Sequence, residues 1–88
     1  MSSTTYLFDV EELNDALVKE TIKEVWQSLE ERGYNPVNQL VGYLMSGDPG
    51  YISNHKEARN KIIKIDRSKL LEIIVKEYMN KWEYLDLI

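Results

Sequence analysis

The side chains that could carry chemistry in this 88-residue chain are few, and they do not form a catalytic group. There is one histidine, His55, and no cysteine, which excludes a metal site of thiolates or clustered histidines. The adjacent carboxylates Glu11-Glu12 and Glu30-Glu31 point to different sides of a helix, so they cannot act as an acid/base pair. We therefore predict a protein that is not an enzyme and needs no cofactor or metal, with His55 as a solvated or capping residue.

Two other groups of side chains could serve modification and recognition. Residues 1–8 begin with a hydroxyl-rich stretch that includes Thr4 and Thr5, and nothing apolar in that stretch would offset the entropy lost on ordering it. We predict a mobile tail. Six basic residues lie between positions 56 and 69, and arginine suits bidentate contact with carboxylate or phosphate. This basic stretch is either a solvated face or a contact surface. The candidates for contact with a partner are Arg59, Arg67 and Lys64.

Composition and charge narrow the classes of function. The net charge of −4 argues against nonspecific binding to nucleic acid, which requires a basic surface. The charges are uneven, because the segment from 9 to 31 has eight acidic residues and two lysines, whereas the stretch from 56 to 69 is basic. We expect an acidic and a basic face. An apolar run of the roughly 20 residues that span a membrane is missing, and so is a signal-peptide pattern, which predicts a cytoplasmic protein without membrane insertion.

The segment from Gly33 to Tyr51 contains all four glycines and both prolines, so it must organise the fold. Gly33 can end one helix in a left-handed conformation, and Asn35 can cap the next helix with Pro36 at its first position. Gly42 within that helix suggests that another backbone passes close to it. Residues 46–50 then close the helix with a turn.

The remaining chain has the apolar spacing of helices. One helix should run from near Val10, capped by Asp9, to Arg32, and a third should span His55 to Ile63 after an N-cap at Asn54. A last long helix should begin after a cap at Asp66 or Ser68. The fold class is therefore all-α, with about four to five helices, two of them long. We place a single domain at residues 9–82 and a frayed end at 83–88.

Apolar residues cover more than half of the circumference of the last helix, which is too broad for a helix packed on one side only. In a chain this short, the second apolar side would meet another copy, so we predict an intertwined or closely packed two-fold homodimer. We expect the three tyrosines Tyr34, Tyr43 and Tyr51 to belong to the core and not to a stacking platform. The residues expected in the core or the dimer interface are Trp26, Leu40, Tyr43, Leu44, Leu71, Ile74 and Tyr78.

The segment from Gly33 to Tyr51, followed by Ala58-Arg59, Ile62, Arg67, Ile74-Val75 and Tyr78, resembles the small IreB-type regulatory phosphoproteins of Gram-positive bacteria. The resemblance extends from about Thr5 to about Met79. It implies phosphorylation of an N-terminal threonine by a membrane Ser/Thr kinase with extracellular PASTA repeats, reversed by a paired phosphatase. Thr5, with Phe8 and Val10 after it, fits the family frame, and counting back from Gly33 favours Thr4 instead.

The resemblance also implies a pathway. In the family, the unmodified form promotes turnover of the UDP-N-acetylglucosamine enolpyruvyl transferase of peptidoglycan synthesis through the ClpC–ClpP protease, and phosphorylation relieves that restraint. One departure stands out, because Ser68-Lys69 follows Arg67 where family members usually have an Asp-Glu pair. This change makes the basic stretch more basic, and it could change which partner the protein binds.

Two other functions fit parts of the sequence. A helix–turn–helix DNA-binding module would use the segment from Gly33 to Met45, but it requires a basic second helix, and residues 36–45 are uncharged. A helical dimer or toxin-neutralising partner that is never phosphorylated would need only the apolar faces. Substitution of Thr4 and Thr5 by alanine separates the last function from the phosphorylated regulator.

Overall fold

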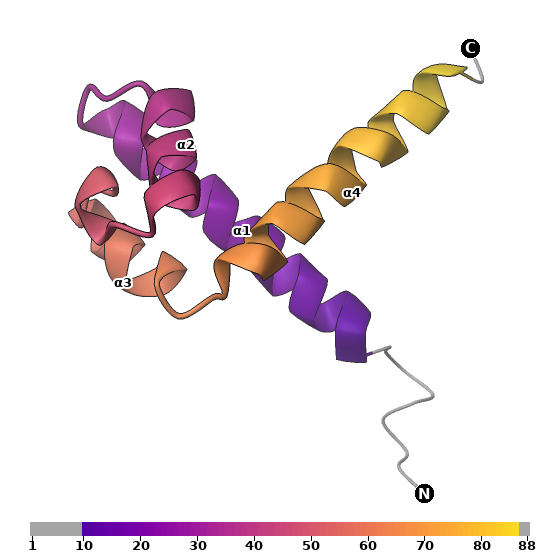
Figure 1. Ribbon diagram of the computed structural model, residues 1–88, viewed down its shortest axis with the longest axis horizontal. Helices are drawn as coiled ribbons and strands as arrows, with labels where there is room; N and C mark the ends of the chain where they lie inside the picture. The colour runs from indigo at the N-terminus through magenta and orange to yellow at the C-terminus, as the bar shows by residue number, and fades with distance from the viewer. Residues whose placement is uncertain (1–9, 87–88) are drawn as a thin grey trace, which may run out of the picture.

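The structure is a computed structural model that describes residues 10–86, with side chains as far as Trp82 (Figure 1). The predicted all-α class is confirmed for these residues, which form helices joined by short turns. The predicted mobile tail, the Asp9 cap and the end of the chain past residue 86 lie outside the described residues. The elements in chain order are α1 (Val10–Glu31), α2 (Pro36–Ser46), the 3-10 helices η2 (Pro49–Tyr51) and η3 (His55–Glu57), α3 (Ala58–Ile62) and α4 (Arg67–Asp86).

Helix α1 begins at Val10 as predicted and ends one residue earlier than predicted, at Glu31. Gly33 takes the left-handed conformation, with φ of 82°, that lets the chain leave the helix. The N–H of Tyr34 then donates to the carbonyl of Leu29 at 2.9 Å and satisfies one of the last carbonyls of the helix. The left-handed stop at Gly33 is therefore confirmed.

Helix α2 has both of its predicted end signals. The Asn35 side chain accepts a hydrogen bond of 3.1 Å from the N–H of Asn38, and Pro36 occupies the first helical position. At the other end, Gly47 adopts φ of 76° and its N–H donates to the carbonyl of Tyr43 at 2.7 Å. The start and the stop of α2 thus follow from its sequence.

Gly42 is close to a side chain and not to the backbone that we expected. A Cβ atom at this position would lie 2.5 Å from ring carbons of Tyr51, so the ring would have to shift to admit it. The ring of Tyr51 therefore lies directly on the backbone of α2 and closes the turn that follows the helix. The side-chain amide of Gln39 fixes the same turn by donating to the Tyr51 carbonyl at 3.1 Å.

The third helix differs from the prediction of one helix over residues 55–63. Lys56 and Glu57 have φ angles of 56° and 63°, so the chain makes the 3-10 turn η3 before α3 begins at Ala58. The predicted Asn54 cap is wrong, because its side chain makes no cap hydrogen bond. The N–H of His55 donates instead to the Ser53 hydroxyl at 3.1 Å.

A contact from α1 explains the break between η3 and α3. The buried hydroxyl of Ser28 donates to the backbone carbonyl of His55 at 2.8 Å, which anchors the turn to the middle of the molecule. Two successive non-glycine residues in the left-handed region cost energy, so long-range contacts must hold them there. Local helix propensity could not reveal this anchor.

The core lies where the C-terminal half of α1 packs against α2, α3 and the start of α4, and we call residues 18–73 the body. Ile22, Leu40, Leu44 and Ile65 pack around its edge. The buried apolar residues are Val18, Val25, Leu29, Tyr43, Ile52, Ala58, Ile62, Leu70 and Ile73.

Helices α1 and α4 cross at the edge of the body and then diverge, as Figure 1 shows. We call residues 10–17 and 74–86 the arms. Leu13 and Leu17 continue the apolar spacing of α1, but both are exposed in the first arm. Ile63 is exposed as well, at the end of α3. As far as Trp82, helix α4 buries Leu70 and Ile73 and leaves its other large apolar residues exposed.

Candidate interaction surfaces

The two arginines expected to contact a partner are used within the chain itself. Arg59 lies on α3 and donates from Nε to the carbonyls of Pro49 and Ile52, at 3.1 and 2.9 Å. These bonds fasten the segment that includes η2 to α3. Arg59 therefore stabilises the turn after α2, and its role in partner binding stays a prediction.

Arg67 has a similar role at the start of α4. Its Nη1 atom donates to the carbonyl of Leu44 at 3.0 Å, near the C-terminus of α2, where a positive charge is favourable. A Cβ atom added at Gly47 would lie 2.9 Å from the guanidinium carbon of Arg67. The left-handed glycine therefore also makes room for the arginine, and partner contact by Arg67 stays a prediction.

Lys64 is the third candidate and lies between α3 and α4. Its side chain is exposed, and in the part of the chain that the structure describes no carboxylate forms an ion pair with it. Lys61 pairs with Glu24 at 3.3 Å, so Lys64 differs from its neighbour. Lys64 is free to contact an anion from outside the body.

A groove of about 590 Å³ runs beside Lys64, between α1 and the connection from α3 to α4. Apolar side chains on its walls include Leu17, Val18 and Ile65, and charged groups lie around them. The sequence does not reveal this groove, because its walls come from α1 and from residues 61–69, which only the fold brings together. The charged residues of the lining are Lys61, Lys64, Asp66 and Lys69.

Helix α4 carries a continuous exposed apolar stripe from Leu71 to Trp82. Ile74 is 40% exposed and Tyr78 is 67% exposed. Helical spacing places all the exposed apolar residues of this stripe on one side of α4. An apolar stripe of this length without a covering element is typical of an interaction surface. The exposed apolar residues of α4 are Leu71, Ile74, Val75, Tyr78, Met79 and Trp82.

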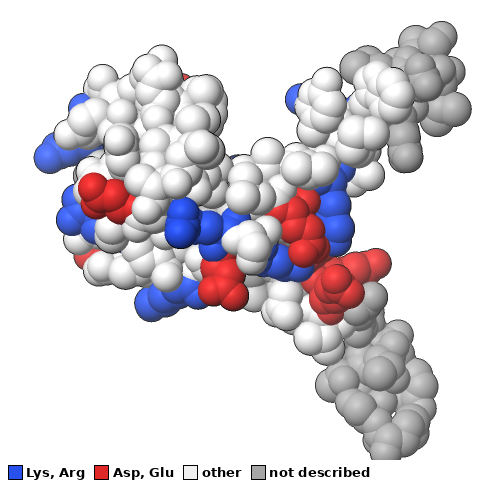
Figure 2. All heavy atoms as spheres, in the orientation of Figure 1, with Lys and Arg blue, Asp and Glu red and all other residues white. Residues whose placement is uncertain are grey.

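A second exposed apolar surface lies on α2. This helix has no charged residue, and Figure 2 shows an uncharged surface in its region of the molecule. Val37, Val41 and Met45 follow each other at steps of four residues, and Met45 is 80% exposed. The molecule therefore has apolar surface on the body as well as on the arm.

Of the residues predicted for the core or the dimer interface, Tyr43 is buried and Leu40 and Leu44 are partly buried beside the core. Trp26 is exposed on α1, and the three on α4 belong to the exposed stripe. The prediction that all three tyrosines are core residues holds for Tyr43 alone. Tyr34 is half exposed, and Tyr51 packs on Gly42 with an exposed edge.

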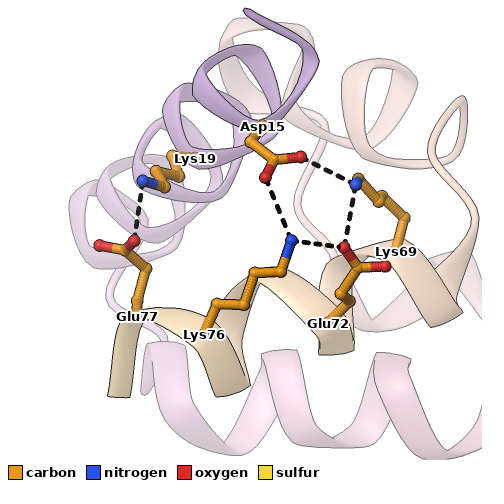
Figure 3. A network of polar contacts seen from close by, with 6 residues as sticks. All are labelled: Asp15, Lys19, Lys69, Glu72, Lys76 and Glu77. Carbon is orange, nitrogen blue, oxygen red and sulfur yellow. Dashed lines mark hydrogen bonds and ion pairs between the residues drawn. The ribbon is translucent and has the colours of Figure 1, made fainter. Parts of the chain in front are cut away.

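Ion pairs join the two long helices where they cross (Figure 3). Lys69 Nζ lies 2.8 Å from Asp15 Oδ1, and Lys76 Nζ lies 3.5 Å from Asp15 Oδ2. Both lysines also contact Glu72, at 3.2 and 2.9 Å. Lys19 and Glu77 form a further pair of 2.7 Å between the same helices. The network fixes the crossing of α1 and α4.

The network shifts the pKa values of its members. The Lys69 ammonium beside Asp15 lowers the pKa of that carboxyl below its ordinary 3.8. Lys76 lowers the pKa of Glu72, and the carboxylates raise the pKa of both lysines. The i to i+3 and i to i+4 pairs around Glu72 were visible in the sequence, whereas Asp15 could not be identified without the crossing.

His55 contacts a carboxylate at the end of α1. Its Nε2 atom lies 2.8 Å from Glu31 Oε1, and Lys56 Nζ lies 3.1 Å from the same oxygen. The hydrogen bond with His55 is the main reason that the pKa of Glu31 falls below its ordinary 4.5. These contacts attach η3 to the end of α1.

The expected separation into an acidic and a basic face is only partial. Acidic residues of α1 pair with basic residues of the later elements, as in the contacts Glu24–Lys61 and Asp15–Lys69. Figure 2 accordingly shows red and blue groups side by side where the helices meet. The opposite charges of the two halves of the sequence therefore stabilise the fold.

The chain matches a protein-family model over most of its length. The family model described as IreB regulatory phosphoprotein matches residues 3–80, which is most of the chain. Proteins of this family are regulatory phosphoproteins and not enzymes. Within residues 10–86, no helix is both long enough and apolar enough to cross a membrane.

Proposed function

Since the chain belongs to the IreB regulatory phosphoprotein family, we propose that it is a cytoplasmic regulator of peptidoglycan synthesis that is switched by phosphorylation of Thr4 or Thr5. The kinase would be a membrane Ser/Thr kinase with PASTA repeats, opposed by its phosphatase. The family match carries this proposal, because it covers residues 3–80 and so includes both threonines. Both also precede α1, which begins at Val10, so no described helix has to open for a kinase to reach them.

The regulator would act as a homodimer. The exposed stripe on α4 supports this proposal, since its residues are exposed when the chain is alone and apolar enough to be covered in an assembly. The uncharged surface of α2 offers a second area for the partner copy. In a closed two-fold dimer, each copy would use the same surface, which suits a chain with an exposed apolar stripe on one long helix.

The downstream target would be the enolpyruvyl transferase that commits UDP-N-acetylglucosamine to peptidoglycan, degraded by the ClpC–ClpP protease when the regulator is unmodified. Purified transferase, ClpC and ClpP with this chain should show faster degradation of the transferase than the same mixture without it. The phosphorylated chain should lose the effect. If the degradation rate is unchanged by either form, the target is a different protein.

The direct test is phosphosite mass spectrometry after incubation of the full chain with the kinase domain of a PASTA-type kinase and ATP. One phosphate on Thr4 or Thr5 is expected, and it should disappear in Thr4→Ala or Thr5→Ala. Thr21→Ala is a matched control, because Thr21 lies within α1 and its hydroxyl bonds the carbonyl of Leu17 at 3.1 Å. A chain that takes up no phosphate on these two threonines contradicts the proposal.

The unmodified helical dimer remains the second candidate, because the same exposed stripe supports it. It predicts normal regulation of the pathway by a Thr4→Ala, Thr5→Ala double variant. The uncharged α2 offers no support for a helix–turn–helix module.

A further inference from the structure

The groove between α1 and the α3–α4 connection is lined by apolar and by charged side chains. Leu17, Val18 and Ile65 are its apolar side chains, and its charged residues are three lysines and Asp66. Lys64 has no ion-pair partner among the residues with described side chains. A suitable occupant therefore combines large apolar side chains with a negative group close to them in sequence.

The N-terminal segment of the chain has this composition once it is phosphorylated. Tyr6, Leu7 and Phe8 are apolar, and they follow Thr4 and Thr5 directly. A phosphate adds about −1.5 to −2 charges and three strong acceptor oxygens. Without the phosphate, residues 1–8 carry no acidic side chain that could contact a lysine.

The length of the segment also suits the groove, because α1 forms one of its walls. Leu17 lies seven residues and Thr21 eleven residues after the start of α1, or about 10 and 17 Å along the helix axis. An extended chain spans about 3.3 Å or more per residue. The five residues from Thr5 to Val10 therefore reach about 17 Å, which is enough to bring Thr5 back beside the groove.

We propose that this groove binds the chain's own N-terminal segment when Thr4 or Thr5 is phosphorylated, with the phosphate on Lys64 and the apolar residues on Leu17 and Ile65. The proposal rests on the proposed phosphorylation of this segment. Lys61 and Lys69 already pair with Glu24 and Asp15, so Lys64 is the residue that meets the phosphate first. Docking would cover the groove and remove it from any partner that reads the unmodified form.

The test uses the full chain made by chemical synthesis with phosphothreonine at position 4 or 5, so no kinase is involved. Chymotrypsin cleaves after Tyr6 and Phe8, and the cleavage rate follows the fraction of chains with an undocked segment. If about two thirds of the segments are docked, cleavage should slow about threefold relative to phosphorylated Lys64→Gln. Amide shifts of Leu17, Thr21 and Ile65 in NMR spectra should change in the same comparison.

Lys23→Gln is the matched control, since Lys23 is an exposed lysine of α1 outside this groove. It should keep the slow cleavage. Equal cleavage rates for the phosphorylated wild type and Lys64→Gln would overturn the proposal. Protection of a phosphorylated Lys64→Gln chain by added unphosphorylated wild type would place the segment in a second copy and overturn the intramolecular assignment. Failure of the kinase reaction alone would contradict the proposed function and leave this result standing.

Discussion

The body and the arms are made of the same two long helices, but their surroundings differ. In the body, α1 has neighbours on several sides, and Val25 and Leu29 are completely buried. In the arms, the same pattern of apolar residues continues without a covering element, so Leu17 and Tyr78 are more than half exposed. The apolar pattern of a helix therefore shows which residues need cover, and only the neighbours decide whether the chain covers them itself.

The largest effect that separates the buried core from the exposed stripe of α4 is expected from truncation of leucines. Leu29→Ala should lower the free energy of unfolding by about 2–5 kcal/mol, because it leaves a cavity among fully buried side chains. Leu71→Ala removes the same atoms from a side chain that is 45% exposed, and should cost less than half as much in dilute solution. Urea unfolding monitored by circular dichroism measures both. Equal costs would show that the exposed stripe of α4 is as well packed as the buried core.

A charge on the arm should affect assembly and leave the body folded. Ile74→Asp places a carboxylate in the exposed stripe, and in a two-fold dimer it would be buried or face its own copy. We expect the dissociation constant of the dimer, measured by analytical ultracentrifugation, to rise at least about tenfold, or ~1.4 kcal/mol.

Asn80→Asp adds the same charge on the opposite side of α4 by helical spacing, and it should leave the dissociation constant nearly unchanged. A similar rise for both variants would indicate that net charge, and not the stripe, controls assembly. A wild-type chain that is monomeric at all concentrations would contradict the dimer.

Within the body, Gly42→Ala tests the packing of Tyr51. The added methyl group would overlap the ring, and the strain should cost about 1–3 kcal/mol despite the better helix propensity of alanine. Tyr51→Ala should make the Gly42→Ala change neutral or stabilising. Unfolding of the two single variants and the double variant gives the coupling between the positions. Independent, additive costs would contradict the contact.

The smallest effect concerns the ion pairs at the crossing and depends on pH. The pKa values of Asp15 and Glu72 are lowered by folding, so their stabilisation is present above their ordinary values of 3.8 and 4.5 and is lost as the pH falls through the lower folded values. The raised pKa of Lys69 and Lys76 gives stabilisation below pH 10.5 that is lost as the pH rises through their folded values. Asp15→Asn should flatten the acid limb of the melting temperature against pH. Parallel limbs for variant and wild type would show that the network does not contribute.

Much of the fold could be predicted because its signals are local. Asn35, Pro36 and the left-handed glycines Gly33 and Gly47 determine where α1 stops and where α2 starts and ends, each through one or two backbone bonds. The break at η3 could not be predicted, since it depends on the hydroxyl of Ser28, 27 residues earlier in the chain. Long-range contacts of this kind leave no periodic pattern in the sequence.

The candidate surfaces also divide into local features, which the sequence predicts, and long-range contacts, which it does not. The broad apolar coverage of α4 was readable from spacing, and the structure shows which part of it stays exposed. The roles of Arg59 and Arg67 were not readable, because their acceptors are carbonyls of segments that only the fold brings close. Residue type indicated that these arginines bind oxygen, but it did not indicate whose oxygen.

The turn at η3 leaves the chain with stability that substitution could recover. Lys56 and Glu57 both occupy the left-handed region, where a residue with a Cβ atom costs about 1–2 kcal/mol and glycine costs almost nothing. Glu57→Gly would therefore be a candidate for a more heat-resistant protein, even after the entropy of the unfolded chain is counted, whereas Lys56→Gly would also remove the ion pair with Glu31. The natural sequence is therefore not the most stable one for this fold, and a single substitution could raise its stability.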